Sequence, residues 1–149
     1  MSGRYFEEFT VGSEIASHGQ TLTESAIIAF AVLYDPQSFH IDVEAAKNSP
    51  YGGLIASGFQ TLAVGFRMFL DTGVLAGTSF GSPAMDDLRW LRPVRPGDTL
   101  RTIARVIDAR PSASKPDRGI VRAAFRILNQ HEHEVLTFST TVFVARRTT

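Results

Sequence analysis

The sequence predicts an α+β fold in which an antiparallel β-sheet wraps around one long apolar helix. Two observations lead to this prediction. Capping residues followed by apolar residues at helical spacing occupy the first half of the chain. Segments rich in β-branched and aromatic residues, separated by Pro, Gly, Asn and charged stretches, fill the second half. Because the most apolar helix has to bury its apolar stripe, we expect the sheet to cover it.

Three helices are expected in the first half. Thr23 is a good N-cap for the first helix, which ends before Pro36 because a proline disfavours helical geometry in the preceding residue. Asp42 caps a short second helix that stops before Pro50. The third helix begins at about Gly58 and ends at an Asp-Thr-Gly sequence. The expected buried stripes are Ile27, Phe30, Ala31 and Tyr34 in the first helix, and Phe59, Leu62, Ala63, Phe66, Phe69 and Leu70 in the third.

The expected strands alternate between a dry face and a wet face. They cover residues 13–20, 88–91, 99–107, 120–128 and 135–145. In the fourth of these segments Val121 and Phe125 alternate with Arg122 and Arg126, as in an antiparallel sheet with one solvated side. Residues 110–119, which are rich in Pro, Ser and charge, are expected to form a surface hairpin loop.

Length, charge and cysteine content limit the class of protein. A chain of 149 residues has the usual size of one domain, so residues 1–149 are expected to form a single domain. With 15 basic and 15 acidic side chains, the formal net charge of zero favours neither nucleic acid nor an anionic membrane. There is no apolar run of membrane-spanning length, and residues 1–9 are too polar for a secretory signal, so we expect a cytoplasmic protein. The lack of cysteine excludes disulfides and thiolate metal sites.

The strongest functional signal is a carboxylate and an imidazole five residues apart, at Asp35 and His40. The start of the third helix, at Ser57 and Gly58, follows shortly after them. A carboxylate and an imidazole that converge on one water can transfer protons near neutral pH. A nearby helix N-terminus offers free N–H groups to a polarised oxygen. These residues therefore predict an acid/base site with an oxyanion-binding partner.

Three stretches of the sequence have the order and separation of motifs from a known family. The first runs from Phe30 through Asp35 to Asp42, the second is YGGLIASG at residues 51–58, and the third is LRPVRPGD at residues 91–98. Over most of its length the chain resembles the MaoC-like dehydratases, the single-hot-dog relatives of (R)-specific enoyl-CoA hydratases. The resemblance implies a hot-dog fold.

The resemblance also implies an acyl thioester substrate, a trans-2-enoyl-CoA or the matching 3-hydroxyacyl-CoA, with no cofactor apart from the CoA of the substrate. Asp35 and His40 would hold the water, and the sequence leaves open which is the acid and which the base. The backbone N–H of Gly58 would bind the thioester oxygen as it becomes negative, and glycine would leave room for the thioester. Gln37 and Ser57 are expected in the substrate site, with Gln37 or Ser38 a candidate to orient His40.

Several other polar residues have two interpretations. Arg92 and Arg95 are candidate contacts for the phosphates of CoA, although exposed arginines on the wet face of a sheet are the commoner explanation. His131 and His133 have a spacing that can chelate a metal, but a charged tip between two strands is more often a solvated hairpin. We predict no metal site, and we interpret Asp42 as a helix cap rather than a third catalytic carboxylate.

Two further functions stay open. A thioesterase on the same fold would direct a carboxylate and water at the thioester carbonyl, although the Asp-to-His spacing matches the hydratase pattern instead. A non-catalytic acyl-CoA binding subunit is suggested by departures from the family pattern at Tyr34, Gln37 and Ser38, and by Ser57 where many relatives carry a His. Open sheet edges and the resemblance together imply a homodimer or a higher assembly of dimers.

Overall fold

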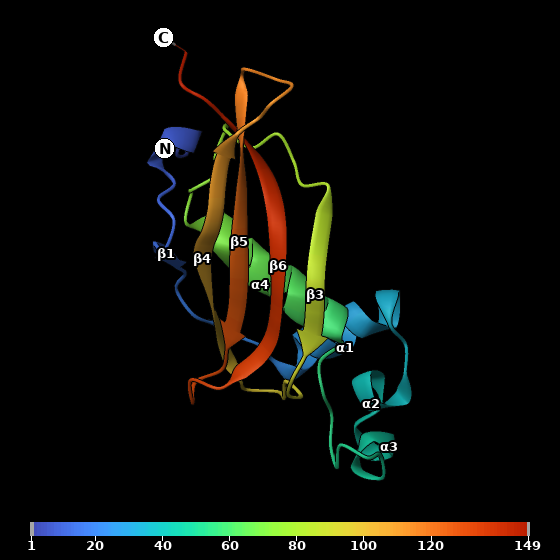
Figure 1. The fold of residues 1–149 in the computed structure, drawn as a ribbon. Helices are drawn as coiled ribbons and strands as arrows, with labels where there is room; N and C mark the ends of the chain where they lie inside the picture. The colour runs from blue at the N-terminus through green and yellow to red at the C-terminus, as the bar shows by residue number, and fades with distance from the viewer. Residues whose placement is uncertain (1, 149) are drawn as a thin grey trace.

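An antiparallel sheet covers one side of the long helix α4, which confirms the predicted α+β architecture (Figure 1). The computed structural model describes residues 2–148; Met1 and Thr149 lie outside the described range. The helices are η1 (Phe6–Glu8), α1 (Glu24–Tyr34), α2 (Ser38–Ile41), α3 (Val43–Lys47) and α4 (Gly58–Asp71). The strands are β1 (Glu14–Ala16), β2 (Gln20–Thr21), β3 (Ala84–Trp90), β4 (Thr99–Pro111), β5 (Arg118–Leu128) and β6 (Glu134–Ala145). No helix among residues 2–148 combines the length and apolarity needed to cross a membrane.

The sheet has the order β1-β4-β5-β6-β3, and β2 pairs with β4. Strands β4, β5 and β6 follow one another as hairpins, whereas β3 crosses to the far edge and pairs with β6. Strand β4 runs beyond its predicted end, because Arg110 pairs with Ile120 and Pro111 with Gly119. The predicted loop over residues 110–119 is therefore wrong at both ends, where its residues extend the two strands.

Helix α4 lies directly against β4 and β5 because a glycine faces them. The Thr102 hydroxyl donates to the carbonyl oxygen of Gly65 at 2.8 Å. A Cβ on Gly65 would lie 2.8 Å from Cγ1 of Ile127, closer than packed carbon atoms approach. Beside this contact Phe125 stacks on Phe138 and meets Phe69 of α4 edge to face, with ring centroids 4.6 and 4.8 Å apart. These contacts form the centre of the core.

The buried face of α4 differs from the predicted one. The buried residues of the helix are Gln60, Thr61, Gly65, Met68 and Phe69, whereas Phe59 and Leu70 are 60% and 43% exposed. The helix turns Gly65 to the sheet, because a residue without a side chain allows the closest approach. Phe59 and Leu70 point away from the sheet, whereas Phe69 of the predicted stripe is buried and Leu62 and Phe66 pack partly buried against the core. The predicted stripe of α1 is also partly wrong, since Tyr34 is 70% exposed while Ile27 and Ala31 are buried.

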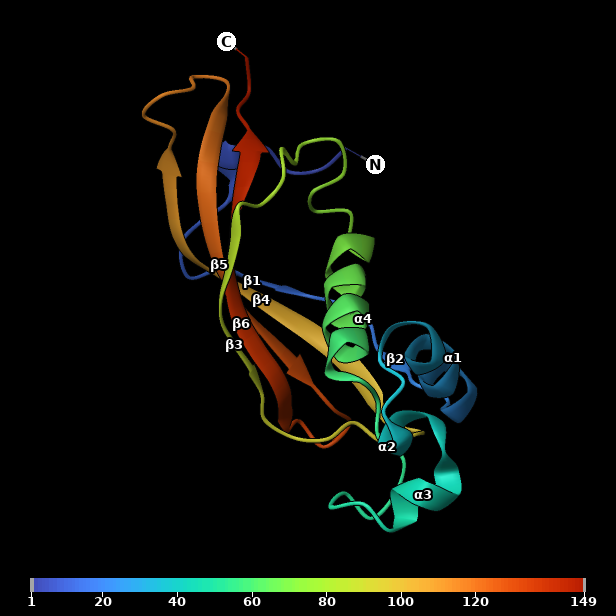
Figure 2. The same cartoon turned by 90° about the vertical axis from the view of Figure 1, so that its right-hand side faces the viewer.

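Helices α1, α2 and α3 gather at the N-terminal end of α4 (Figure 2). Thr23 caps α1 by accepting the N–H of Ala26 at 3.2 Å, as predicted. Asp42 caps α3 by accepting the N–H of Ala45 at 3.0 Å, which confirms its role as a cap. Helix α2 was not predicted, because four residues are too few to show a helical period. This single turn places His40 beside the end of α1.

Candidate active site

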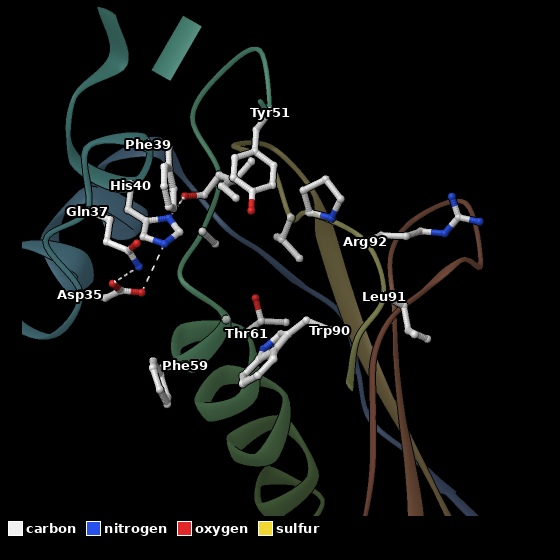
Figure 3. A pocket seen from close by; sticks show the side chains of 15 residues that line it. Asp35, Gln37, Phe39, His40, Tyr51, Phe59, Thr61, Trp90, Leu91 and Arg92 are labelled. Atoms are coloured by element: carbon white, nitrogen blue, oxygen red, sulfur yellow. Dashed lines mark hydrogen bonds and ion pairs between the residues drawn. The ribbon is translucent and has the colours of Figure 1, made fainter. Parts of the chain in front are cut away.

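A cavity of about 500 Å³ opens between α2, the first turn of α4 and the segment that joins β3 to β4 (Figure 3). Most of its wall is apolar and aromatic, with a few polar groups at one side. The lining residues are Asp35, Gln37, Phe39, His40, Tyr51, Ile55, Ala56, Gly58, Phe59, Thr61, Trp90, Leu91, Arg92, Pro93 and Val94. An apolar cavity with a few convergent polar groups is the usual form of a small-molecule site.

Asp35 and His40 face each other at one side of this cavity (Figure 3). Asp35 is the C-cap residue of α1, and its backbone N–H donates to the carbonyl oxygen of Ala31 at 2.9 Å. Nε2 of His40 lies 3.2 Å from Oδ2 of Asp35. His40 is almost fully buried, and Asp35 is largely buried. The structure therefore brings together the two residues that the sequence singles out as an acid/base pair.

The carbonyl of Ile55 determines which nitrogen of His40 can exchange a proton. Nδ1 of His40 lies 2.7 Å from the carbonyl oxygen of Ile55. Since a carbonyl only accepts, Nδ1 carries a hydrogen and Nε2 is the nitrogen that gains and loses one. Two backbone bonds hold the Ile55 segment: the N–H of Ile55 donates to Phe39 and that of Ala56 to Val94, at 3.1 and 2.8 Å. Sequence reasoning missed Ile55 because a backbone acceptor leaves no signal in residue type.

Hydrogen bonds keep Asp35 ionised. Burial raises the pKa of Asp35, but donation from Gln37 and Ser57 and the nearby charge of His40 outweigh burial and hold that pKa below its ordinary value of 3.8. Nε2 of Gln37 donates to Oδ1 at 2.7 Å, and the Ser57 hydroxyl donates to Oδ2 at 2.7 Å. Near neutral pH the pair therefore contains a fixed carboxylate beside an imidazole.

Gln37 and Ser57 both act on Asp35 in this structure. Gln37 does not orient His40 as suggested, since its side chain bonds Asp35 while Ile55 holds the imidazole. Ser57 is fully buried and is not among the cavity-lining residues. It is the N-cap of α4, where its Oγ also accepts the N–H of Phe59 at 3.3 Å. One hydroxyl thus connects the start of α4 to the carboxylate.

Gly58 lines the cavity as the first residue of α4. Among residues 2–148 no backbone acceptor takes up its N–H, as expected for the first turn of a helix. The space that the glycine leaves is filled by the indole of Trp90. A Cβ on Gly58 would lie 2.6 Å from Cε2 and 2.9 Å from Cδ1 of that ring, and closer still to Nε1. The glycine is therefore required for packing, a reason that sequence reasoning missed.

The predicted basic and histidine candidates lie farther from the pair. Arg92 is exposed at the cavity rim and its guanidinium points away from His40 (Figure 3). Arg95 donates to the carbonyl oxygen of Tyr51 and does not line the cavity. His131 and His133 are exposed at the turn between β5 and β6, where Asn129 accepts both of their backbone N–H groups. Within residues 2–148 no group of three or more His, Asp or Glu side chains gathers as a metal site would require.

A sheet packed on one central helix, with an Asp–His pair at the start of that helix, defines a hot-dog protein with a candidate acid/base site. The chain belongs to the family described as MaoC like domain, whose pattern it matches over residues 8–123.

Similar proteins support the same assignment. The crystal structure of a MaoC-like dehydratase from Rhodospirillum rubrum superposes with a TM-score of 0.92 at 38% identity, covering 99% of this chain and 100% of that one. The uncharacterized protein YdeM of Bacillus subtilis is 31% identical over 140 residues, 94% of this chain and 98% of that protein. The (R)-hydratase PhaJ1 of Pseudomonas aeruginosa shares the fold, with a TM-score of 0.73 at 22% identity over 96% of this chain and 86% of that one.

Proposed function

We propose that this protein is an acyl-CoA hydro-lyase, which adds water to a trans-2-enoyl-CoA to give an (R)-3-hydroxyacyl-CoA or catalyses the reverse. The observation that carries the proposal is the 3.2 Å contact between Asp35 and His40 inside a largely apolar cavity. Membership of the MaoC-like family supports a hydratase-type role, and PhaJ1, which shares the fold, is an (R)-hydratase.

The geometry suggests different roles for the two residues. A group transfers protons best when its pKa is close to the working pH, which an imidazole ordinarily satisfies and a carboxylate of lowered pKa does not. His40 Nε2 therefore takes a proton from the bound water as the oxygen attacks the β-carbon. It then delivers that proton to the α-carbon, so that one water adds across the double bond. Asp35 stays ionised, accepts the second hydrogen of the water and stabilises the imidazolium.

The start of α4 would stabilise the negative charge that develops on the thioester oxygen. The free N–H of Gly58 and the positive end of the helix dipole both lie at the cavity wall. The rim at Arg92 would take the CoA arm, since a guanidinium suits phosphate oxygens. Arg95, which holds the Tyr51 loop, would act only by supporting this wall.

The departures from the family pattern are compatible with catalysis. Tyr34 is exposed on α1 and does not line the cavity. Gln37 and Ser57 supply the two hydrogen bonds that fix Asp35. These substitutions therefore leave the pair assembled, which favours the hydro-lyase over a non-catalytic binding subunit.

The proposed enzyme is a homodimer joined along β3. This strand is the last in the sheet order, so one of its edges is unpaired within the described residues. Large apolar side chains are exposed at its end and on the nearby start of α4, namely Phe59, Trp90 and Leu91. Exposed apolar groups at an unpaired edge favour pairing with another copy. Sedimentation at twice the mass of one chain is expected, and a monomer at micromolar concentration would contradict it.

An absorbance assay tests the activity. Loss of the enoyl absorbance of crotonyl-CoA, and of longer and branched enoyl-CoAs, is measured for the wild type and for Asp35→Asn and His40→Gln. Each variant is expected to lose at least about a hundredfold in kcat/KM, the size typical of lost general acid/base catalysis. The variant His131→Ala, at the exposed hairpin turn, is the matched control and should keep the wild-type rate.

The same assay separates the alternatives. Release of free thiol without hydration would identify a thioesterase. Binding of every enoyl-CoA tested, with no turnover, would identify a binding subunit. The two variants also test the assigned roles: if His40 transfers the proton and Asp35 only stabilises it, His40→Gln loses more kcat than Asp35→Asn, and the reverse order would assign the base to Asp35.

A further inference from the structure

Trp90, one of the exposed apolar residues at the β3 edge, also lines the cavity, and the mechanism proposed above gives it no catalytic role. It is the last residue of β3, and its backbone is held in the sheet opposite Leu136. The residue is 48% exposed and lines the cavity. Phe59 contacts it edge to face, with ring centroids 6.0 Å apart and an interplanar angle of 70°. The ring is therefore fixed from two sides while part of it stays open to a bound molecule.

The polar edge of this ring is the part nearest to α4. Of the atoms around Gly58, Nε1 of Trp90 comes closest to the position of an added Cβ, ahead of Cε2 and Cδ1. Figure 3 shows the indole nitrogen turned toward the first turn of the helix. An indole nitrogen can only donate. Two N–H groups, one from the backbone of Gly58 and one from the side chain of Trp90, thus lie side by side at the cavity wall.

We propose that the indole N–H of Trp90 is a second hydrogen-bond donor to the thioester oxygen, beside the backbone N–H of Gly58. This inference rests on the proposed function. A single donor leaves one lone pair of the developing oxyanion to water, whereas a second fixed donor stabilises the negative charge without reorganisation. It also explains why the residue at position 58 has no side chain: the indole could not otherwise bring its nitrogen to this point.

The variant Trp90→Phe tests the donor because it keeps an aromatic ring at this position, although a smaller one, and removes the N–H. We expect kcat for crotonyl-CoA to fall by about a hundredfold, the lower end of the range for loss of one oxyanion donor, with KM changed by less than about threefold. A ring that only packs would change KM or stability and leave kcat intact. Phe80→Leu removes another exposed aromatic ring, outside the cavity, and should keep the wild-type kcat. Light scattering confirms that all variants keep the wild-type assembly.

A binding comparison tests the same contact without turnover. Butyryl-CoA has the carbonyl oxygen and S-butyl-CoA, a thioether, lacks it; neither can be hydrated. Calorimetry gives the Kd of each ligand. The ratio of the Kd for S-butyl-CoA to the Kd for butyryl-CoA should be about threefold to tenfold larger in the wild type than in Trp90→Phe, the size of one net hydrogen bond. An equal preference in the two proteins would overturn the proposed donor.

Trp90 is the only tryptophan of the chain, so its fluorescence reports on this site alone. Butyryl-CoA should change the emission of the wild type in a saturable way. Calorimetric binding with no change in emission would place the thioester elsewhere and refute the inference, while hydration by the wild type would leave the proposed function standing. A saturable change without hydration of any enoyl-CoA would refute the proposed function and retain the contact. If the protein neither binds butyryl-CoA nor hydrates any enoyl-CoA, both proposals are refuted.

Discussion

Replacing Ser57 with alanine would remove a hydroxyl that has two functions in this fold. Its oxygen accepts the N–H of Phe59 at the start of α4, and its hydrogen is donated to Asp35 at 2.7 Å. Loss of an N-cap costs about 1 kcal/mol of stability. Loss of a hydrogen bond to a charged group costs about 1.5–3 kcal/mol. One hydroxyl serves both contacts, and the cap bond is long, at 3.3 Å. We therefore expect the total cost to be less than the sum of the two, about 2 kcal/mol.

The expected loss is large enough to measure in two ways. For a chain of this size, about 2 kcal/mol lowers Tm by about 4–8 °C, which thermal unfolding followed by circular dichroism will detect. Asp35 also loses one of the groups that lower its pKa and fix its position, so kcat/KM for an enoyl-CoA should fall by about tenfold.

Thr23→Ala is the matched control for this prediction. Thr23 also caps a helix, accepting the N–H of Ala26 at 3.2 Å, but its side chain has no contact with Asp35. It should lose about 1 kcal/mol and keep the wild-type kcat/KM. If Ser57→Ala loses no more stability and no more activity than Thr23→Ala, the hydroxyl is only a cap, and the reasoning that couples it to the carboxylate is wrong.

Two further predictions concern pH and packing. The lowered pKa of Asp35 means that its ionised form adds stability above the ordinary carboxyl pKa of 3.8, and that this stability is lost as pH falls through the lower folded value. The difference in unfolding free energy between wild type and Asp35→Asn, from urea titrations, should therefore be constant near neutral pH and shrink below about pH 4; a constant difference down to about pH 2 would contradict this. Gly65→Ala should destabilise by about 1–2 kcal/mol although alanine favours a helix, because its Cβ meets Ile127. Adding Ile127→Val, which removes Cδ1, should recover part of that loss, and no recovery would argue against this contact.

The candidate pair could be predicted because its residue types and spacing are local features. Asp35 and His40 are only five positions apart, and Pro36 ends the helix between them, so a short chain segment brings them close together. The groups that give the pair its chemistry are distant in sequence. Ile55 fixes the imidazole through a carbonyl, and Trp90 reaches the site from the end of the edge strand β3. Neither contact follows from a residue type.

The helix faces show the same division. The sequence correctly predicts where α4 begins and ends, because Ser57 and the Asp-Thr-Gly sequence act within one turn of the helix. It predicts only part of the side that meets the sheet, since Phe69 is buried as expected but Phe59 and Leu70 are exposed. That side contains Gly65, whose small size matters only when Ile127 and Thr102 lie opposite it.

The sequence by itself determined most of the helices and strands, the apolar character of the core and the candidate acid/base pair, because caps, periodicity and motif spacing act over a few residues. The tertiary structure alone decided the rotation of α4, the crossing of β3 to the far edge and the set of groups around Asp35. These depend on close packing and on hydrogen bonds between segments far apart in the chain, which are formed only when the sheet closes over the helix.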